Sequence, residues 1–201
     1  MLEATGLGMR FGRLWALRGV SLRLAPGDAL SVRGGNGAGK TTLLRLCAGM
    51  LSPAEGRVAL DSAAGAAALR ARSTLLGAPP DLYPSLSLEA NLRYGLAVRG
   101  LRVTRVRAGE VLREFGVARP ETRAAGASLG EGVRCAMAIA NLAEPELLLL
   151  DEPAGCLDEE GLRLLDSLMA RTLARGGCVV EAAVALPPRG RLLVLERGAA
   201  L

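Results

Sequence analysis

Several residue types are absent or scarce in this chain of 201 residues, and each absence excludes a kind of chemistry. Histidine is missing, which excludes a histidine-dependent catalytic triad, a histidine metal ligand and a histidine pH switch. Glutamine is missing as well, and lysine occurs once, at position 40, among 25 basic residues. Aromatic residues make up only 2% of the chain, which leaves few surfaces on which nucleic-acid bases could stack.

The net charge of +5 comes almost entirely from arginine. A charge of this sign is compatible with contact to nucleic acid or to an anionic membrane face. The arginines are spread along the chain, however, which favours a bias in composition over a basic binding patch. We therefore expect no nucleic-acid partner.

Long hydrophobic runs are also missing, although half of the residues are apolar. The longest aliphatic runs, at 147–150 and 192–195, are far shorter than the roughly 20 residues that cross a bilayer. The first residues show no basic start, apolar core or small-residue cleavage site, so we expect no signal peptide. The four cysteines are far apart and form no C-x-x-C pair. The sequence therefore predicts a cytoplasmic protein without disulfides or structural zinc.

Short strand-like runs alternate with helical ones at both ends of the chain, whereas the middle third reads as helical. Strands are expected at 29–32, 56–61, 147–150, 178–184 and 191–196, and helices at 41–51 and 159–175. The run 147–150 is purely apolar, as in a strand buried on both faces of a parallel sheet. Trp15 and the helix 161–173 are expected to serve packing, and Glu181 to lie at a sheet edge or a strand end. This order predicts an α/β core with a helical insert.

A glycine-rich segment fits the phosphate-binding pattern G-x-x-x-x-G-K-[ST], and it lies between a predicted strand and a predicted helix. Its glycines allow backbone N–H groups to surround phosphate oxygens, and the helix adds the positive end of its dipole. Lys40, the only lysine, occupies the position that would reach the β- and γ-phosphates, and Thr41 would give its hydroxyl to Mg²⁺. The predicted nucleotide-binding residues are Gly34, Gly35, Asn36, Gly37, Ala38, Gly39, Lys40, Thr41 and Thr42.

Two acids, Asp151 and Glu152, close the apolar strand. Chemistry in parallel sheets lies at the carboxyl ends of the strands, where such a pair can hold Mg²⁺ and activate water. We expect Asp151 to hold the metal, and Glu152 to act as the general base beside Lys40. An acid pair at a strand end can also be a simple cap, but the order of phosphate loop, helical insert, apolar strand and acids favours catalysis.

With these motifs the sequence resembles the ATP-binding subunits of ABC transporters, from residue 2 to about residue 197. The segment 151–158 matches the family pattern D-E-P-x-x-x-L-D. The resemblance implies a P-loop NTPase fold of the α/β class, with a mostly parallel central sheet, an N-terminal antiparallel β subdomain and an inserted α-helical subdomain. It implies one ABC-type ATP-binding domain over 1–201, with a core at about 1–86 and 143–201 and the helical subdomain at about 87–142.

The resemblance also assigns roles outside the phosphate loop. It puts Phe11 in the aromatic position that stacks on adenine, and Asp158 in the loop that communicates across a dimer enclosing two nucleotides. Counting back from Pro145 puts the family's signature loop at Ser128 and Gly130, which would contact the ATP of the partner. The implied ligands are ATP and Mg²⁺, and the implied partners are a separate transmembrane permease and a second ATPase subunit, identical or related.

Several family positions are altered. Leu129 replaces a glycine and Glu131 replaces a glutamine in the signature loop, and both changes weaken an anion site at a helix N-terminus. The glutamine expected after the third strand falls at Ala78 or Pro79, and the switch histidine falls at Val184. Losing one preorganised donor typically costs roughly 10² to 10³ in rate, so we expect tight Mg-ATP binding and slow hydrolysis in isolation.

The function expected from the resemblance is that of the ATP-hydrolysing subunit of an ABC exporter, peripheral on the inner face of the cell membrane. The small size is similar to that of the haem-exporter ATPases of cytochrome c maturation, so haem export is the first expectation for the cargo. A degenerate ATP-binding regulatory subunit with little hydrolysis of its own is the alternative. An ATPase of a drug or lipid exporter, and a soluble ABC ATPase acting on the ribosome or DNA, are further alternatives.

Overall fold

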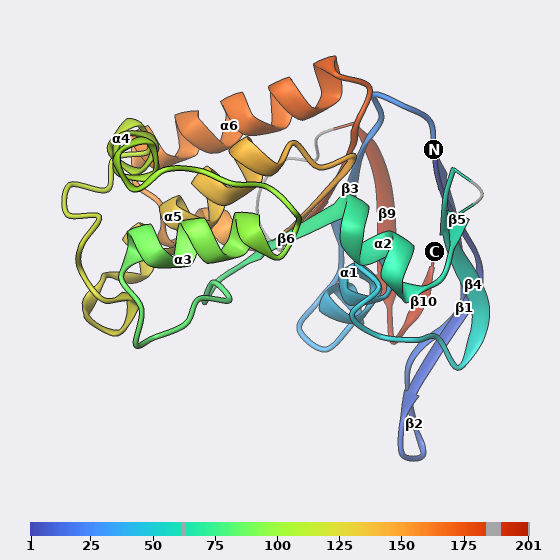
Figure 1. Cartoon of the computed structure of the whole chain (residues 1–201). Coiled ribbons are helices and arrows are strands. Elements are labelled where there is room, and N and C mark those ends of the chain that lie inside the picture. The colour runs from blue at the N-terminus through green and yellow to red at the C-terminus, as the bar shows by residue number, and fades with distance from the viewer. Residues whose placement is uncertain (62, 184–189, 201) are drawn as a thin grey trace. The chain divides into compact units, whose positions relative to one another are not determined.

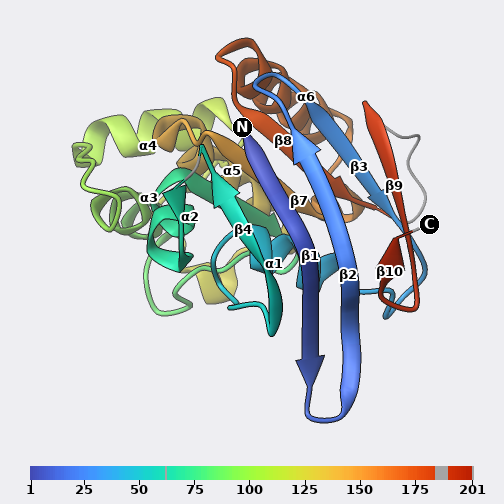
Figure 2. The same ribbon diagram turned by 90° about the vertical axis from the view of Figure 1, so that its right-hand side faces the viewer.

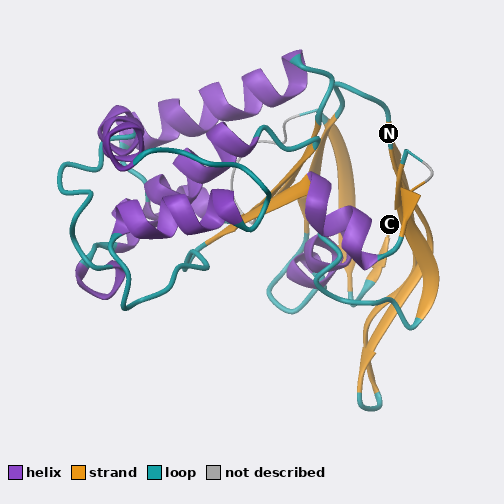
Figure 3. Cartoon of the chain, viewed as in Figure 1, coloured by secondary structure: helices purple, strands orange, loops and turns teal. Residues whose placement is uncertain are grey.

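The computed structural model describes residues 1–61, 63–183 and 190–200, and they form two compact units. The first unit comprises Met1–Leu75, Glu146–Glu152 and Arg171–Leu201, and the second comprises Leu76–Pro145 and Pro153–Ala170. Strands dominate the first unit and helices the second (Figures 1 and 3). The sequence-based division at 87 and 142 stays a prediction; in the structure, the second unit also takes in the segment that follows Glu152.

The first unit begins with an antiparallel sheet. Its strand order is β2-β1-β4-β5, formed by Leu14–Leu24, Leu2–Phe11, Glu55–Leu60 and Ala63–Ala64. The register of β1 and β2 runs from Leu2 opposite Leu24 to Phe11 opposite Leu14, so the two strands form one long hairpin (Figure 2). The core face of this hairpin carries Leu7, Leu17 and Val20, which are fully buried.

A mostly parallel sheet supports the phosphate loop. Its order is β10-β9-β3-β8-β7-β6, formed by Ala199–Ala200, Arg191–Glu196, Ala29–Arg33, Cys178–Ala182, Leu147–Asp151 and Ser73–Gly77. The strand β3 pairs in parallel with both β8 and β9, and β7 pairs in parallel with β8. The helices α1 (Lys40–Cys47) and α2 (Ala66–Arg72) complete the first unit. Every leucine of Leu147–Leu150 has no exposed surface, which confirms the predicted doubly buried strand.

Side chains alternate between the two faces of these strands, and this alternation determines which of them enter the hydrophobic core. One face of the sheet and the apolar face of α1 bury a single cluster, which includes Leu30, Val32, Leu43, Leu44, Leu147, Leu149, Val180 and Ala182. Of the two places expected for Glu181, the sheet edge is wrong, because β8 lies between β3 and β7, whereas the strand end fits better, because Glu181 is the last residue but one of β8. Glu181 is 2% exposed beside Ser31. One oxygen of Glu181 has no hydrogen-bond partner among the described residues.

The second unit consists of helices joined by capped turns. They are α3 (Leu88–Ala97), α4 (Arg105–Glu114), η1 (Ala124–Gly126), α5 (Leu129–Ala143), η2 (Pro153–Cys156) and the first part of α6 (Glu159–Ala174). Ser87, Thr104 and Ser128 cap the starts of α3, α4 and α5, since each side chain accepts a backbone N–H three residues later. Among the helices of the described residues, none has the length and apolar character needed to span a membrane.

Candidate functional site

The loop between β3 and α1 is shaped by glycines with left-handed backbone angles. Gly37 has φ +77° and Gly39 has φ +98°, a region that side chains rarely adopt. A Cβ at Gly39 would lie 2.4 Å from the carbonyl oxygen of Ala16, whereas Gly35 and Gly37 have open space around them. The loop is therefore tightly packed where it enters the helix and free at its tip, where Gly35, Asn36 and Gly37 are exposed.

The lysine side chain folds back onto this loop. The Nζ of Lys40 donates to the carbonyl oxygens of Gly34, at 2.9 Å, and Gly35, at 3.2 Å. Lys40 is the first residue of α1 and is 6% exposed, so the contacts hold a buried ammonium at the positive end of the helix. Its Nζ also lies 3.6 Å from Oε1 of Glu152, which joins the loop electrostatically to the end of β7.

Two oxygen ligands suited to a divalent cation meet beside the lysine. Thr41 Oγ1 donates to Asp151 Oδ1 over 3.1 Å, although the two residues are 110 positions apart in the sequence. Thr41 is in the first turn of α1, and Asp151 is the last residue of β7. A hydroxyl and a carboxylate are the kind of oxygen donors that Mg²⁺ prefers. This donor pair fits the metal, and bound Mg²⁺ would neutralise charge on the phosphates.

Glu152, the residue after Asp151, has an unusual backbone conformation. Its φ is +55°, which a non-glycine residue adopts only at an energetic cost, and its N–H donates to the carbonyl oxygen of Ala182. This conformation ends β7, and the carboxylate is about half exposed. An exposed carboxylate next to a buried ammonium can orient and deprotonate water. No local sequence signal indicated the left-handed conformation.

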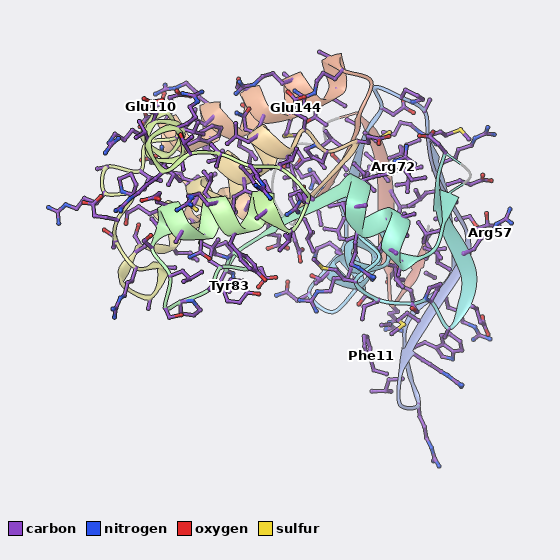
Figure 4. The ribbon with its side chains drawn as sticks, in the orientation of Figure 1. Phe11, Arg57, Arg72, Tyr83, Glu110 and Glu144 are labelled. Carbon is purple, nitrogen blue, oxygen red and sulfur yellow. The ribbon has the colours of Figure 1, made fainter. Side chains whose placement is uncertain are left out.

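The hairpin of β1 and β2 presents an exposed aromatic residue. Phe11 is 55% exposed and projects from the hairpin (Figure 4), so its ring is available for stacking. Trp15 is 37% exposed and has the guanidinium carbons of Arg10 and Arg18 5.9 and 5.8 Å from its ring centroid. These distances allow cation–π contacts. The expectation that Trp15 serves packing stays a prediction.

In the second unit, Ser128 and Gly130 lie at the start of α5. The Oγ of Ser128 accepts the N–H of Glu131, and Oε2 of Glu131 accepts both the N–H and the hydroxyl of Ser128. Together these contacts form a capping box. The spacing S-x-x-E was the signal that could have predicted it. Leu129 follows the cap with its side chain about half exposed, and a Cβ at Gly130 would lie 2.9 Å from the carbonyl oxygen of Cys156.

The carboxylate of Asp158 binds to two groups of the second unit. Its Oδ1 accepts the N–H of Gly161 at 2.8 Å and pairs with the guanidinium of Arg134 at 2.5 Å, and these contacts hold the pKa of Asp158 below its ordinary value. Arg134 is 6% exposed and also donates to the carbonyl oxygen of Phe115. Arg134 thus fixes the Asp158 loop against α5, a role that nothing in the sequence distinguishes among so many arginines. Val184, the expected histidine position, lies outside the described residues.

A phosphate-binding loop followed by an apolar strand that ends in two acids defines an ATP-binding protein. The chain belongs to the ABC transporter family, whose family model matches residues 17–155, and it is an ATP-binding subunit of that family. This confirms the resemblance found in the sequence, and the expected fold class with it.

The chain is similar over nearly its whole length to proteins of one kind. It is 37% identical over 205 residues to "Cytochrome c biogenesis ATP-binding export protein CcmA 2" of Cupriavidus metallidurans, covering 99% of this chain and 97% of that protein. It is 38% identical to the corresponding export protein of Methylococcus capsulatus, covering 88% and 87%. A solved ATP-binding subunit of an ABC transporter superimposes with a TM-score of 0.88 at 26% identity, covering 100% of this chain and 88% of that one.

Proposed function

We propose that the chain binds and hydrolyses Mg-ATP for an ABC exporter whose permease is a separate polypeptide at the cell membrane, and that this export serves cytochrome c biogenesis. The observation that carries the proposal is the convergence of Lys40, Thr41, Asp151 and Glu152 on the glycine loop. The names of the relatives support the cytochrome c assignment. Haem is the cargo that we propose.

In this proposal each group has a defined task. The ammonium of Lys40 would move from the loop carbonyls to the β- and γ-phosphates, while loop N–H groups hold the remaining phosphate oxygens. Thr41 and Asp151 would hold Mg²⁺. The carboxylate of Glu152 would accept a proton from the attacking water, and the exposed ring of Phe11 would stack on adenine.

The binding part is tested with fluorescent ATP and the variant Lys40→Ala. We expect the variant to lose ATP affinity by about a hundredfold or more, because the phosphates lose a charge-assisted contact in a buried setting. Arg45→Ala is the matched control, since it removes an exposed cation from the same helix. Equal affinity of Lys40→Ala and wild type would refute the phosphate-site assignment.

A second candidate is a regulatory subunit that binds ATP but hydrolyses little of it. The capping box of Ser128 and Glu131 favours it, because this turn is already occupied by a carboxylate of the chain. Measuring hydrolysis beside binding separates the two candidates: binding without turnover supports the regulatory subunit.

A further inference from the structure

Arg33 is the last residue of β3, immediately before the phosphate loop. Its Nη1 donates to the carbonyl oxygen of Ala183 over 3.0 Å, and this hydrogen bond is partly buried. Ala183 directly follows β8, and 150 positions separate the two residues in the sequence. The side chain of Arg33 therefore joins the entrance of the phosphate loop to the carboxyl end of the neighbouring strand.

This contact takes the place of a backbone hydrogen bond of the sheet. Val32 lies opposite Ala182 in the parallel pairing of β3 and β8, and the N–H of Ala183 donates to the carbonyl oxygen of Val32 over 3.3 Å. If β3 continued, the N–H of Gly34 would be the next donor and would reach the carbonyl oxygen of Ala183. Because β3 ends at Arg33, the guanidinium supplies that donor instead. Ala183 is buried, where a carbonyl without a donor would cost free energy.

The same end of β8 holds the backbone of Glu152. The peptide group between Ala182 and Ala183 donates its N–H to β3, and its carbonyl oxygen accepts the N–H of Glu152 over 3.1 Å. Glu152 has φ +55°, a conformation that persists only where the surroundings hold it in place. Since the carbonyl that Arg33 binds belongs to the next peptide group, Arg33 restrains the orientation of the group that Glu152 contacts. The carboxylate of Glu152 lies 3.6 Å from the Nζ of Lys40.

Arg33 lies on the face of the sheet that is opposite the hydrophobic cluster. Val32 and Ala182 belong to that cluster, whereas Ser31 and Glu181, which are paired in register, point to the other face. Arg33 follows Ser31 by two residues and therefore shares its face. The carboxylate of Glu181 is buried there, and its charge favours a cation on this face. The guanidinium thus reaches the end of β8 without crossing the hydrophobic cluster.

We propose that Arg33 is a positioning residue for ATP hydrolysis, which holds the carboxyl end of β8 and, through it, the backbone of Glu152. This inference rests on the proposed function, in which Glu152 is the general base. Arg33 acts on the rate of hydrolysis and not on the affinity for ATP, because Lys40 and Thr41 contact their own partners without it.

The experiment compares Arg33→Met, which keeps an unbranched side chain but no N–H donor, with Arg33→Lys, which keeps a cationic donor. Each variant is made with and without Glu152→Gln. Arg70→Met is the matched control, because Arg70 also donates a partly buried guanidinium hydrogen bond, to the carbonyl oxygen of Gly49 over 2.8 Å, beyond the carboxyl end of α1.

Three quantities are measured on every variant. Release of phosphate from radiolabelled ATP gives kcat, and titration with fluorescent ATP gives the dissociation constant. Nuclear magnetic resonance follows the exchange of the backbone amide of residue 152 with solvent, which reports on its hydrogen bond to Ala182 without any need for turnover.

We expect Arg33→Met to lower kcat about tenfold or more while the dissociation constant of ATP stays within about twofold, because a small displacement of a catalytic group costs rate. The amide of Glu152 should exchange about tenfold faster or more, because its acceptor is no longer held. In the Glu152→Gln background, Arg33→Met should change kcat by less than about twofold, since residues that act through one group are not additive. Arg33→Lys should recover most of kcat, and Arg70→Met should change none of the three quantities.

An unchanged kcat in Arg33→Met would overturn the inference. Equal falls of kcat with and without Glu152→Gln would also overturn it, as would a loss that Arg33→Lys does not recover. If the wild type does not hydrolyse ATP, the catalytic part of the proposed function fails, and amide exchange alone then tests Arg33. Faster exchange of the Glu152 amide in Arg33→Met would still support its positioning role, and unchanged exchange would refute it.

Discussion

Replacing the loop glycines by alanine, one at a time, tests whether the loop geometry is the one described. At Gly35 a Cβ meets no atom within 4 Å and φ is not left-handed, so Gly35→Ala should change the free energy of unfolding by less than about 0.5 kcal/mol. At Gly37 space is open but φ is +77°, so Gly37→Ala should cost about 1–2 kcal/mol.

Gly39→Ala should be the most destabilising of the three. At φ +98° this variant carries the same cost of a left-handed backbone as Gly37→Ala. Its new Cβ would also lie 2.4 Å from the carbonyl oxygen of Ala16 and 2.7 Å from Cδ2 of Leu17, and such overlaps typically cost a further 1–3 kcal/mol. The expected loss is therefore about 2–5 kcal/mol. Urea unfolding followed by circular dichroism measures the series. Equal stability of the three variants, or Gly35→Ala as the least stable of them, would refute the reasoning.

Three further predictions concern the rest of the first unit and the buried thiols. Burial raises the pKa of Cys47 and of Cys135 to about 12, so iodoacetamide at pH 8 should modify them only after unfolding, as mass spectrometry would show; modification of the native protein would contradict this. Leu44→Ala removes a fully buried side chain of the core and should lower the free energy of unfolding by about 2–5 kcal/mol in urea titrations, whereas a loss under 1 kcal/mol would mean that α1 does not pack as described. Hydrogen bonds from Arg72 hold the pKa of Glu146 below its ordinary value. The stability that Glu146 contributes is therefore present above its unfolded pKa and is lost as the pH falls through the lowered folded value. The stability difference between wild type and Glu146→Gln should shrink in unfolding titrations from pH 6 to pH 3, and a constant difference would refute this prediction.

The phosphate loop and the strand β7 could be predicted because their signals are local. A glycine motif between a strand and a helix specifies its own backbone, and four leucines before two acids specify a buried strand with polar groups at its end. The helix was expected from Thr41 to Leu51 but runs from Lys40 to Cys47, because Ala48 is its C-cap and Gly49 follows with a left-handed φ of +67°. The exact first and last residues of a helix depend on how the neighbouring loops pack, and this packing cannot be read from the sequence.

The remaining features depend on contacts between distant residues. The hydrogen bond of Thr41 with Asp151 spans 110 positions, and Arg134 of α5 pairs with Asp158 in the loop before α6. Glu181 was expected at a sheet edge or a strand end. Its burial in β8 follows from the strand order, which one sequence does not fix.

The most direct test of the account is the steady-state release of phosphate from ATP by the wild type beside the Glu152→Gln variant. The account predicts a slow rate in the wild type that falls by about 10² or more when the carboxylate of Glu152 is replaced, because the attacking water loses its base. The same rate in both proteins would contradict the claim that the end of β7 and the phosphate loop form the catalytic site.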